Sequence, residues 1–191
     1  MAPRRTRFLW LGLITLGALI SVSARSVPAA SSHPTENDVE AAYLYQFGNF
    51  VQWPAKSGAD KPKAFTICVL GDDPFGHVLE DTVRGSKMNG LPMAARQIGN
   101  VRDTAGCQIL FISSSQKDQL DADLLTLRGA PILTVSDISD FVPRGGMIQF
   151  VLIDNRVRFE IGLPSAQIAG LKLSSQLLKV AVAVRGGATM K

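Results

Sequence analysis

Apolar residues recur at helical spacing in the segment that precedes Pro54. Residues 35–38, Thr-Glu-Asn-Asp, have the form of a capping box, in which the Thr35 and Asp38 side chains each accept from the other residue's backbone N–H. The apolar positions that follow are Val39, Tyr43, Phe47, Phe50 and Val51. Because proline cannot continue a helix, this pattern predicts one long amphipathic helix that ends just after Trp53.

Short apolar runs of strand character alternate with helical segments over the rest of the chain. The predicted strands cover about 65–70, 93–97, 108–112, 131–135, 147–152 and 157–161, the last two joined by a tight turn at Asp154-Asn155. The predicted helices cover about 74–83, 116–127, a brief segment at 139–141, 164–169 and 176–184. The expected caps are Asp72 or Asp73 for the first of these helices, a serine within 113–115 for the second and Ser174 for the last. This order predicts an α/β fold, a single-domain sandwich of helices around a mixed sheet of about six strands.

The first thirty residues follow a different pattern. Three arginines at positions 4, 5 and 7 precede an uncharged run of 13 residues from Phe8 to Ile20, and small residues follow it. This is the form of a secretory signal peptide, and the run is shorter than the roughly 20 residues that a spanning helix needs. We therefore expect cleavage after Ala24, or as late as Ala30, and an exported protein without direct membrane insertion after cleavage. A loose leader is expected at 25–36 and a folded domain at 37–191.

The net charge of the mature chain bears on which classes of partner it can bind. Residues 1–24 carry three arginines and no acid, so their removal leaves 167 of the 191 residues and lowers the formal charge from +4 to +1. Nucleic-acid binding rests on clustered lysine and arginine that neutralise phosphates. A nearly neutral mature chain is not expected to bind nucleic acid.

The chain has two cysteines, Cys68 and Cys107, and each belongs to an apolar run of strand character. Thiols are normally paired in an oxidising compartment, and a bridge is reasonable if the two strands are neighbours. Such a bond would stabilise the fold by very roughly 4 kcal/mol in the chain-entropy model. The alternative is two buried free thiols.

Candidate catalytic groups are few. The chain has two histidines, His33 in the leader and His77, and no His, Cys and acid cluster has metal-ligand spacing. The serines at 113–115 lack the Gly-x-Ser-x-Gly elbow and an obvious base, which favours helix capping. Asp72 and Asp73 adjoin a glycine and a proline, which favours a cap and a turn. The sequence therefore predicts no catalytic site, no metal and no cofactor.

The first predicted helix carries more aromatic residues than one buried face needs: Tyr43, Tyr45, Phe47, Phe50 and the nearby Trp53. Tyr45 falls outside the face defined by residues 39, 43, 47 and 50. A helix with apolar side chains on two faces packs either a second protein or a second copy of itself, or is buried on both sides within one domain. Both alternatives remain open at this point.

Five separated blocks of sequence carry a family resemblance. They are residues 40–54 (EAAYLYQFGNFVQWP), 65–71 (FTICVLG), 133–137 (LTVSD) with 145–148 (GGMI), 158–161 (RFEI) and 169–178 (AGLKLSSQLL). In this order and at this spacing they resemble the YfiR family of bacterial periplasmic regulators, which includes HmsC. The resemblance covers essentially the whole predicted mature chain.

The resemblance implies regulation by binding. YfiR-like proteins bind the periplasmic sensor domain of a YfiN-like inner-membrane diguanylate cyclase and hold it inactive, and a YfiB-like outer-membrane lipoprotein sequesters the repressor, which raises cyclic di-GMP and promotes biofilm formation. Cys68 and Cys107 match the family's disulfide positions, whereas a second cysteine pair found in some members is absent. A homodimer is also implied.

The predicted terminal hairpin and the short helix after it suggest where a partner binds. Strand residues alternate faces, so Phe150 shares a face with Ile148 and Leu152, whereas Glu160 shares one with Arg158. An apolar centre beside a charge suits a regulated interface, and we hypothesise that Phe150, Glu160 and Ile168 contribute to it. Phe150 and Ile168 could instead be ordinary core.

Two other functions are weighed against this one. A small-solute sensor would bind its ligand at strand ends near 71–75 or 113–115. A soluble enzyme ranks third, because the sequence shows no catalytic constellation.

Overall fold

The computed structural model describes residues 34–55 and 62–186. The predicted signal peptide, its cleavage sites, the leader up to residue 33 and His33 lie outside the described residues. None of the described helices is long and apolar enough to cross a membrane.

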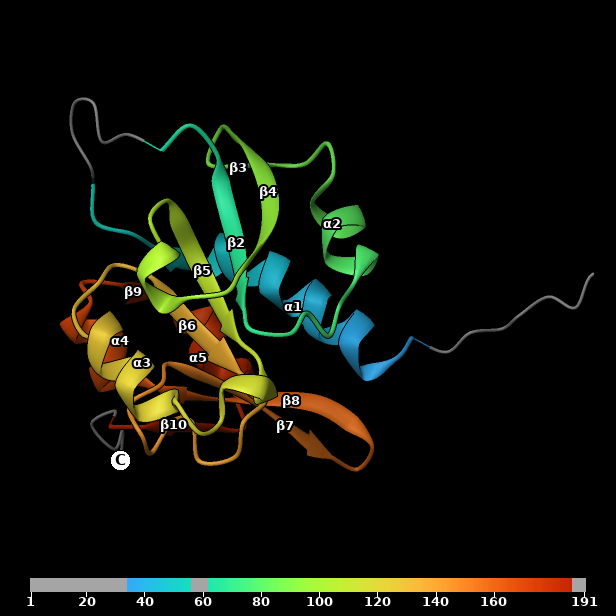
Figure 1. The fold of residues 1–191 in the computed structure, drawn as a ribbon. Coiled ribbons are helices and arrows are strands. Elements are labelled where there is room, and N and C mark those ends of the chain that lie inside the picture. Colours follow the sequence, from blue (N-terminus) through green and yellow to red (C-terminus); the bar gives the residue numbers. More distant parts are fainter. Residues whose placement is uncertain (1–33, 56–61, 187–191) are drawn as a thin grey trace, which may run out of the picture. The chain divides into compact units, whose positions relative to one another are not determined.

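An eight-stranded mixed sheet forms the centre of the fold, with strand order β10-β8-β7-β6-β5-β2-β4-β3 (Figure 1). Its strands are β2 (Phe65–Leu70), β3 (Lys87–Met88), β4 (Leu91–Ile98), β5 (Cys107–Ile112), β6 (Leu133–Ser136), β7 (Ile148–Ile153), β8 (Arg156–Gly162) and β10 (Ala183–Arg185). The strands β4, β2, β5, β6 and β7 run parallel, whereas β3 pairs antiparallel with β4 and β8 antiparallel with β7. A separate two-stranded sheet joins β1 (Val51–Gln52) to β9 (Lys172–Leu173). The predicted α/β class is therefore correct.

Helices cover both faces of the sheet. They are α1 (Glu36–Phe50), α2 (His77–Val83), α3 (Leu120–Leu127), α4 (Leu163–Ile168) and α5 (Ser175–Val180), with short 3-10 turns η2 (Val101–Asp103) and η3 (Ser114–Gln116). The helices α1 and α3 lie on opposite faces (Figure 1). Two apolar clusters result, and the sheet separates them.

The cluster on the α1 face is rich in aromatic rings. Phe47 packs against Phe150 and Phe159 with ring centroids 6.0 and 5.2 Å apart, and Tyr43 contacts the same two rings. Tyr45 also packs against this cluster. The aromatic side chains of α1 are thus accommodated within the domain, which favours the interpretation of a helix buried on more than one side.

Local signals near the start of the chain and in the hairpin are confirmed. Thr35 and Asp38 form the predicted capping box at the start of α1. The hairpin turns at Asp154 and Asn155, whose φ angles of 49° and 58° fit a primed two-residue turn. Ser174 caps α5 by accepting from the backbone N–H of Leu177.

Several predicted helix boundaries are wrong. The first helix ends at Phe50, because Val51 and Gln52 pair with β9 instead. The second begins only at His77, since Asp73 accepts from the backbone N–H of Phe75 and closes a turn rather than capping the helix. In the third, Ser113 caps η3, and α3 starts later, at Leu120.

Three further differences concern the second half of the chain and the sheet. Residues 139–141 form a turn in which Asp140 has a φ of 62°, so no helix forms there. The last helix stops at Val180, because residues 183–185 pair with β8 as strand β10. The sheet has eight strands rather than about six, and the two additional strands are the short edge strands β3 and β10.

Candidate functional site

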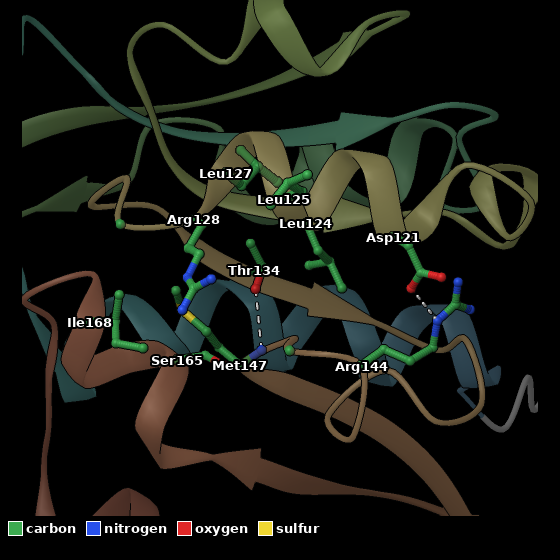
Figure 2. A pocket seen from close by; sticks show the side chains of 12 residues that line it. Asp121, Leu124, Leu125, Leu127, Arg128, Thr134, Arg144, Met147, Ser165 and Ile168 are labelled. Atoms are coloured by element: carbon green, nitrogen blue, oxygen red, sulfur yellow. Dashed lines mark hydrogen bonds and ion pairs between the residues drawn. The ribbon is translucent and has the colours of Figure 1, made fainter.

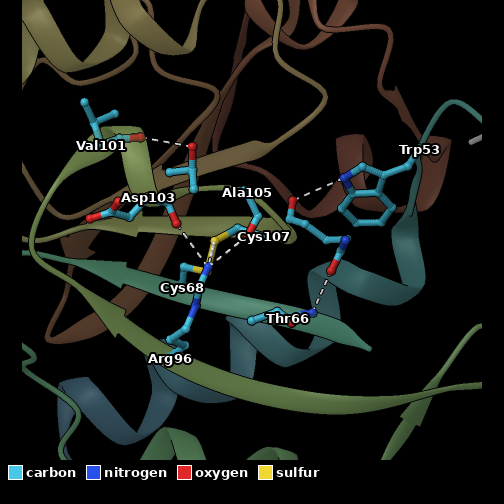
Figure 3. Close-up of a disulfide and its surroundings, with 10 residues drawn as sticks. Trp53, Thr66, Cys68, Arg96, Val101, Asp103, Ala105 and Cys107 are labelled. Carbon is cyan, nitrogen blue, oxygen red and sulfur yellow. Dashed lines mark hydrogen bonds between the residues drawn. A yellow bond between two sulfur atoms is a disulfide. The ribbon is translucent and has the colours of Figure 1, made fainter. Parts of the chain in front are cut away.

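The predicted disulfide bond between Cys68 and Cys107 is present and joins β2 to β5 (Figure 3). Both cysteines are buried, and their Cα atoms are 5.8 Å apart. The two cysteines are the only ones in the chain, so the alternative of two free thiols is wrong.

The guanidinium of Arg96 lies against the disulfide (Figure 3). Its Nη2 is 3.4 Å from Cys107 Sγ and 3.8 Å from Cys68 Sγ, and the same nitrogen donates to the backbone carbonyls of Asp103 and Ala105. Arg96 therefore links β4 to the loop that leads into β5.

Strand β5 contains a bulge at Gln108, and the Gln108 side chain satisfies a backbone group that the bulge leaves without a partner. Thr66 pairs with Cys107, but the next residue of β2, Ile67, pairs with Ile109, so Gln108 is the extra residue. A bulge leaves ladder groups without a backbone partner. Here the Gln108 side chain accepts from the Thr66 N–H at 2.6 Å, and the Gln108 carbonyl accepts from Trp53 Nε1. The sheet around the disulfide is thus satisfied internally.

Phe150, the first of the three predicted partner-binding residues, is buried. It lies on β7 with 3% of its surface exposed and stacks on Phe47. Its side chain belongs to the α1 face of the sheet, because its ring packs against Tyr43 and Phe47 of α1. It is core, as the alternative held, and any contribution to partner binding stays a prediction.

Glu160, on β8, points to the other face of the sheet. It pairs across the hairpin with Gln149, which in turn pairs with Ser136 of β6, and paired residues share a face. One carboxylate oxygen accepts from Nε and Nη2 of Arg185 at 3.1 and 2.9 Å. This carboxylate is half-buried and is paired with an arginine of the edge strand β10.

Ile168 ends α4 with 58% of its surface exposed. It lines a pocket of about 310 Å³ between α3, α4 and the loop before β7, which we call the α3–α4 pocket (Figure 2). The lining residues are Asp121, Leu124, Leu125, Leu127, Arg128, Gly129, Thr134, Arg144, Gly145, Met147, Ser165 and Ile168. Ile168 is therefore available for contact.

An ion pair bridges one end of the α3–α4 pocket. Arg144 Nε donates to Asp121 Oδ1 at 2.7 Å and so links α3 to the loop before β7 (Figure 2). This hydrogen bond lowers the pKa of the Asp121 carboxyl and raises the pKa of Arg144. Both groups therefore stay charged around neutral pH.

The structure separates the three predicted partner-binding residues. Phe150 lies in the core on the α1 face, whereas Glu160 faces the opposite side and Ile168 lies at the pocket. Sequence reasoning missed Leu125, which is 70% exposed at the same pocket, and Arg185, which holds Glu160. The sequence offered no signal for Leu125, because neighbouring helix positions such as 124 and 125 can both belong to one apolar face.

The strand ends proposed for a small solute are filled by protein. A side chain at position 71 would collide with Ser115 Oγ and approach the side chain of Gln116. Ser115 Oγ also accepts from the backbone N–H of Asp72 at 2.9 Å. The predicted turn role of Asp73 is confirmed by its bond to Phe75. Among residues 34–55 and 62–186, no group of three His, Cys, Asp or Glu side chains could hold a metal ion.

Comparisons with known proteins agree with the fold and identify the family. A search of the curated proteins finds no match. Among solved structures, a conserved domain protein from Vibrio cholerae O1 biovar El Tor strain N16961 is similar, with a TM-score of 0.54 and 9% identity. The similarity covers 79% of this chain but 60% of that protein, so this chain spans less than two thirds of its length, and at this identity it shows the fold alone. The family model described as YfiR/HmsC-like matches residues 37–182, and the chain belongs to this family.

Proposed function

We propose that this protein represses an inner-membrane diguanylate cyclase by binding the periplasmic sensor domain of that enzyme. Family membership supports, at the family level, a periplasmic regulator of cyclic di-GMP signalling that acts by binding rather than by catalysis. The observation that carries the proposal is the family match over residues 37–182, which includes the hairpin and both helices of the α3–α4 pocket.

The α3–α4 pocket is the surface that we propose for the cyclase. Leu125 and Ile168, which line it, expose 70% and 58% of their surfaces, and the apolar residues Leu124, Leu127 and Met147 line it as well. Arg128 and the Arg144–Asp121 pair add charge around this apolar centre. Apolar anchors give affinity at such an interface, while charges at the rim give specificity.

Phe150 and Glu160 act differently in this proposal. Phe150 is a positioning residue, because its ring packs the hairpin onto α1 and does not reach the pocket. Glu160 belongs to the same face of the sheet as α3 and presents a carboxylate held by Arg185. It does not line the α3–α4 pocket, and in this proposal it adds a negative charge to the interface outside the pocket.

Repression then follows from linkage. A repressor that binds the inactive sensor domain more tightly than the active one shifts the equilibrium by that difference in affinity and by no more. A YfiB-like outer-membrane lipoprotein that lowers the concentration of free repressor reverses the shift. No ligand or cofactor is needed for this switch.

A pull-down from inner-membrane extract tests the proposed function. The mature protein on a resin should retain a membrane protein with a diguanylate cyclase domain, identified by mass spectrometry. Ile168→Asp should abolish retention, whereas the control Val180→Asp should not, because Val180 is 64% exposed on α5 and does not line the pocket. The proposal fails if folded wild-type protein retains no cyclase, or if both variants retain it equally.

The predicted homodimer is a separate proposal. Sedimentation equilibrium of the mature protein gives its mass in solution, and a monomer at micromolar concentration would exclude it. The cyclase proposal does not depend on the result.

A further inference from the structure

A hollow with acidic walls lies between the first turns of α1 and the hairpin β7–β8 on the α1 face of the sheet. It has a volume of about 220 Å³. Its lining residues are Glu36, Asn37, Glu40, Asp137, Phe150, Val151, Leu152 and Val157. We call it the acidic hollow. Its acids come from two separate parts of the chain, α1 and the residue after β6.

Glu40 is the unusual member of this set. Only 8% of its surface is exposed, and it lines the hollow; neither of its carboxyl oxygens is both fully enclosed and without a hydrogen bond, so the carboxyl group stays in contact with the hollow. No hydrogen bond or ion pair within the described residues reaches its carboxyl group. A buried carboxylate without a partner is costly, so such groups normally have a hydrogen-bond donor or a cation beside them.

The charged groups that act on Glu40 are both negative. Burial is the largest cause that raises the pKa of Glu40 to about 8, and the carboxyl groups of Asp137 and Glu36 contribute to the same rise. The arginines of the hairpin, Arg156 and Arg158, alternate with Val157 along β8 and so belong to the opposite face. His77 of α2 acts on Asp38, which does not line the hollow.

A small metal ion does not suit this arrangement. In the described part of the chain, the acids do not converge on one point as three or more metal ligands. An extended organic cation can instead donate hydrogen bonds in several directions, as a guanidinium or ammonium group does. The other walls of the hollow are apolar, formed by Phe150, Leu152 and Val157. They suit the aliphatic stem of such a cation.

We propose that the acidic hollow is a binding site for one organic cation, a guanidinium or primary ammonium group on an aliphatic stem, with Glu40 as its principal partner. Glu36 and Asp137 add negative charge at the sides. The group belongs either to a free small amine or to a basic side chain of a partner protein. This site is separate from the proposed cyclase surface, because the acidic hollow and the α3–α4 pocket share no lining residue.

Cation binding at this site is coupled to proton release. The cation needs the ionised form of Glu40, and near neutral pH the proton must leave first. Affinity therefore falls as the pH decreases below about 8, by up to about tenfold per pH unit. The charged groups that face Glu40 are the carboxyls of Glu36 and Asp137, and the raised pKa of Asp137 acts in the same direction.

Isothermal titration calorimetry with 1-butylguanidinium tests the site on the mature wild-type protein. Saturable binding is expected at pH 9, weaker binding at pH 6, and none with the neutral analogue butylurea. Glu40→Gln keeps the shape of the side chain and should weaken binding by about tenfold or more. The control Glu80→Gln removes an equal charge from an exposed position on α2 outside the hollow and should leave affinity unchanged.

Three results would overturn the proposal: no saturable binding of 1-butylguanidinium at pH 9, equal binding of butylurea, or unchanged affinity in folded Glu40→Gln. Two further probes distinguish the sources. Tighter binding of agmatine than of N-acetylargininamide assigns the site to a free amine, and the reverse order assigns it to a basic side chain. These outcomes do not depend on whether a cyclase is retained in the pull-down.

Discussion

The two ends of the central sheet differ in how far their polar and apolar side chains find partners within the domain. Around β2, β4 and β5, a disulfide crosses the strands, Gln108 closes the bulge and Arg96 binds two carbonyls and the sulfur atoms. At the hairpin β7–β8, Leu152 and Ile153 are exposed, and Glu40 beside them has no internal partner. The strand groups at the first end have partners within the domain, although Asp123 Oδ2 on α3, which packs against η2, is buried without a hydrogen bond in the described residues. At the second end the Glu40 side chain lines an open hollow, where a group from outside can reach it.

This difference indicates how stability and recognition are divided. Buried polar groups without partners cost free energy, and contiguous exposed apolar patches, unlike singly exposed side chains, are typical of surfaces that bind another molecule. The disulfide end can therefore be changed only at the expense of the fold. The hairpin end should tolerate substitutions that alter binding.

The largest expected effect is loss of the disulfide. The double variant Cys68→Ala/Cys107→Ala should lose about 4 kcal/mol of unfolding free energy, because the bond closes a loop with a sequence separation of 39. Urea unfolding of the variant, and of wild-type protein with reductant, measures the loss. If the urea midpoint is unchanged in both samples, the disulfide does not stabilise its end of the sheet, and the contrast with the hairpin end fails.

The next effect is a dependence of stability on pH that comes from Glu40. Its pKa is about 8 in the folded protein and near the ordinary 4.5 in the unfolded chain, so the folded state binds more protons between these values. Stability is therefore fully present below about pH 4.5 and falls as the pH rises to about 8. Glu40→Gln should remove this decline and be more stable than wild type at pH 9 by ~1–3 kcal/mol.

Thermal unfolding at several pH values between 5 and 9 measures this effect. The control Glu80→Gln should keep the wild-type slope. If stability falls with pH equally in wild type and Glu40→Gln, ionisation of Glu40 costs no unfolding free energy. The proposed difference between the hairpin end and the disulfide end would then be wrong.

A smaller effect on stability separates structure from recognition at Glu160. Glu160→Lys breaks the pair with Arg185 and should cost about 1 kcal/mol or less, since the arginine is largely exposed. It should nevertheless abolish cyclase retention and derepress the cyclase. The swap Glu160→Lys/Arg185→Glu should restore the unfolding free energy but not cyclase retention. If the swap also restores retention, Glu160 acts only through its pair with Arg185 and does not contact the cyclase.

The smallest effect is expected at the tip of the hairpin. Leu152→Ser should change the unfolding free energy by no more than about 0.5 kcal/mol, because the side chain is 51% exposed. The matched variant Ile109→Ala in β5 should cost ~2–5 kcal/mol, because that residue is fully buried. Similar denaturation midpoints for the two variants would contradict the proposed division between the two ends.

Local signals predicted much of the fold. The capping box at Thr35, the turn at Asp154-Asn155 and the strand at 65–70 appear as expected, because each depends on residues next to one another in the chain. The disulfide followed from the number of cysteines and the expected compartment. Phe150 was placed less well, because alternation along a strand does not reveal which face is buried, whereas Ile168 on α4 is exposed.

The sequence by itself determined the fold class, the disulfide and the family, since these depend on short-range pattern and on order along the chain. Only the tertiary structure decided that residues 183–185 form an edge strand, that Arg185 holds Glu160, and that Glu40 faces Asp137. The physical reason is that strand pairing, burial and the energies of charges depend on groups that are distant in sequence. Glu40 lies in an ordinary amphipathic helix, and it becomes a strained carboxyl only when the hairpin and the loop after β6 enclose it.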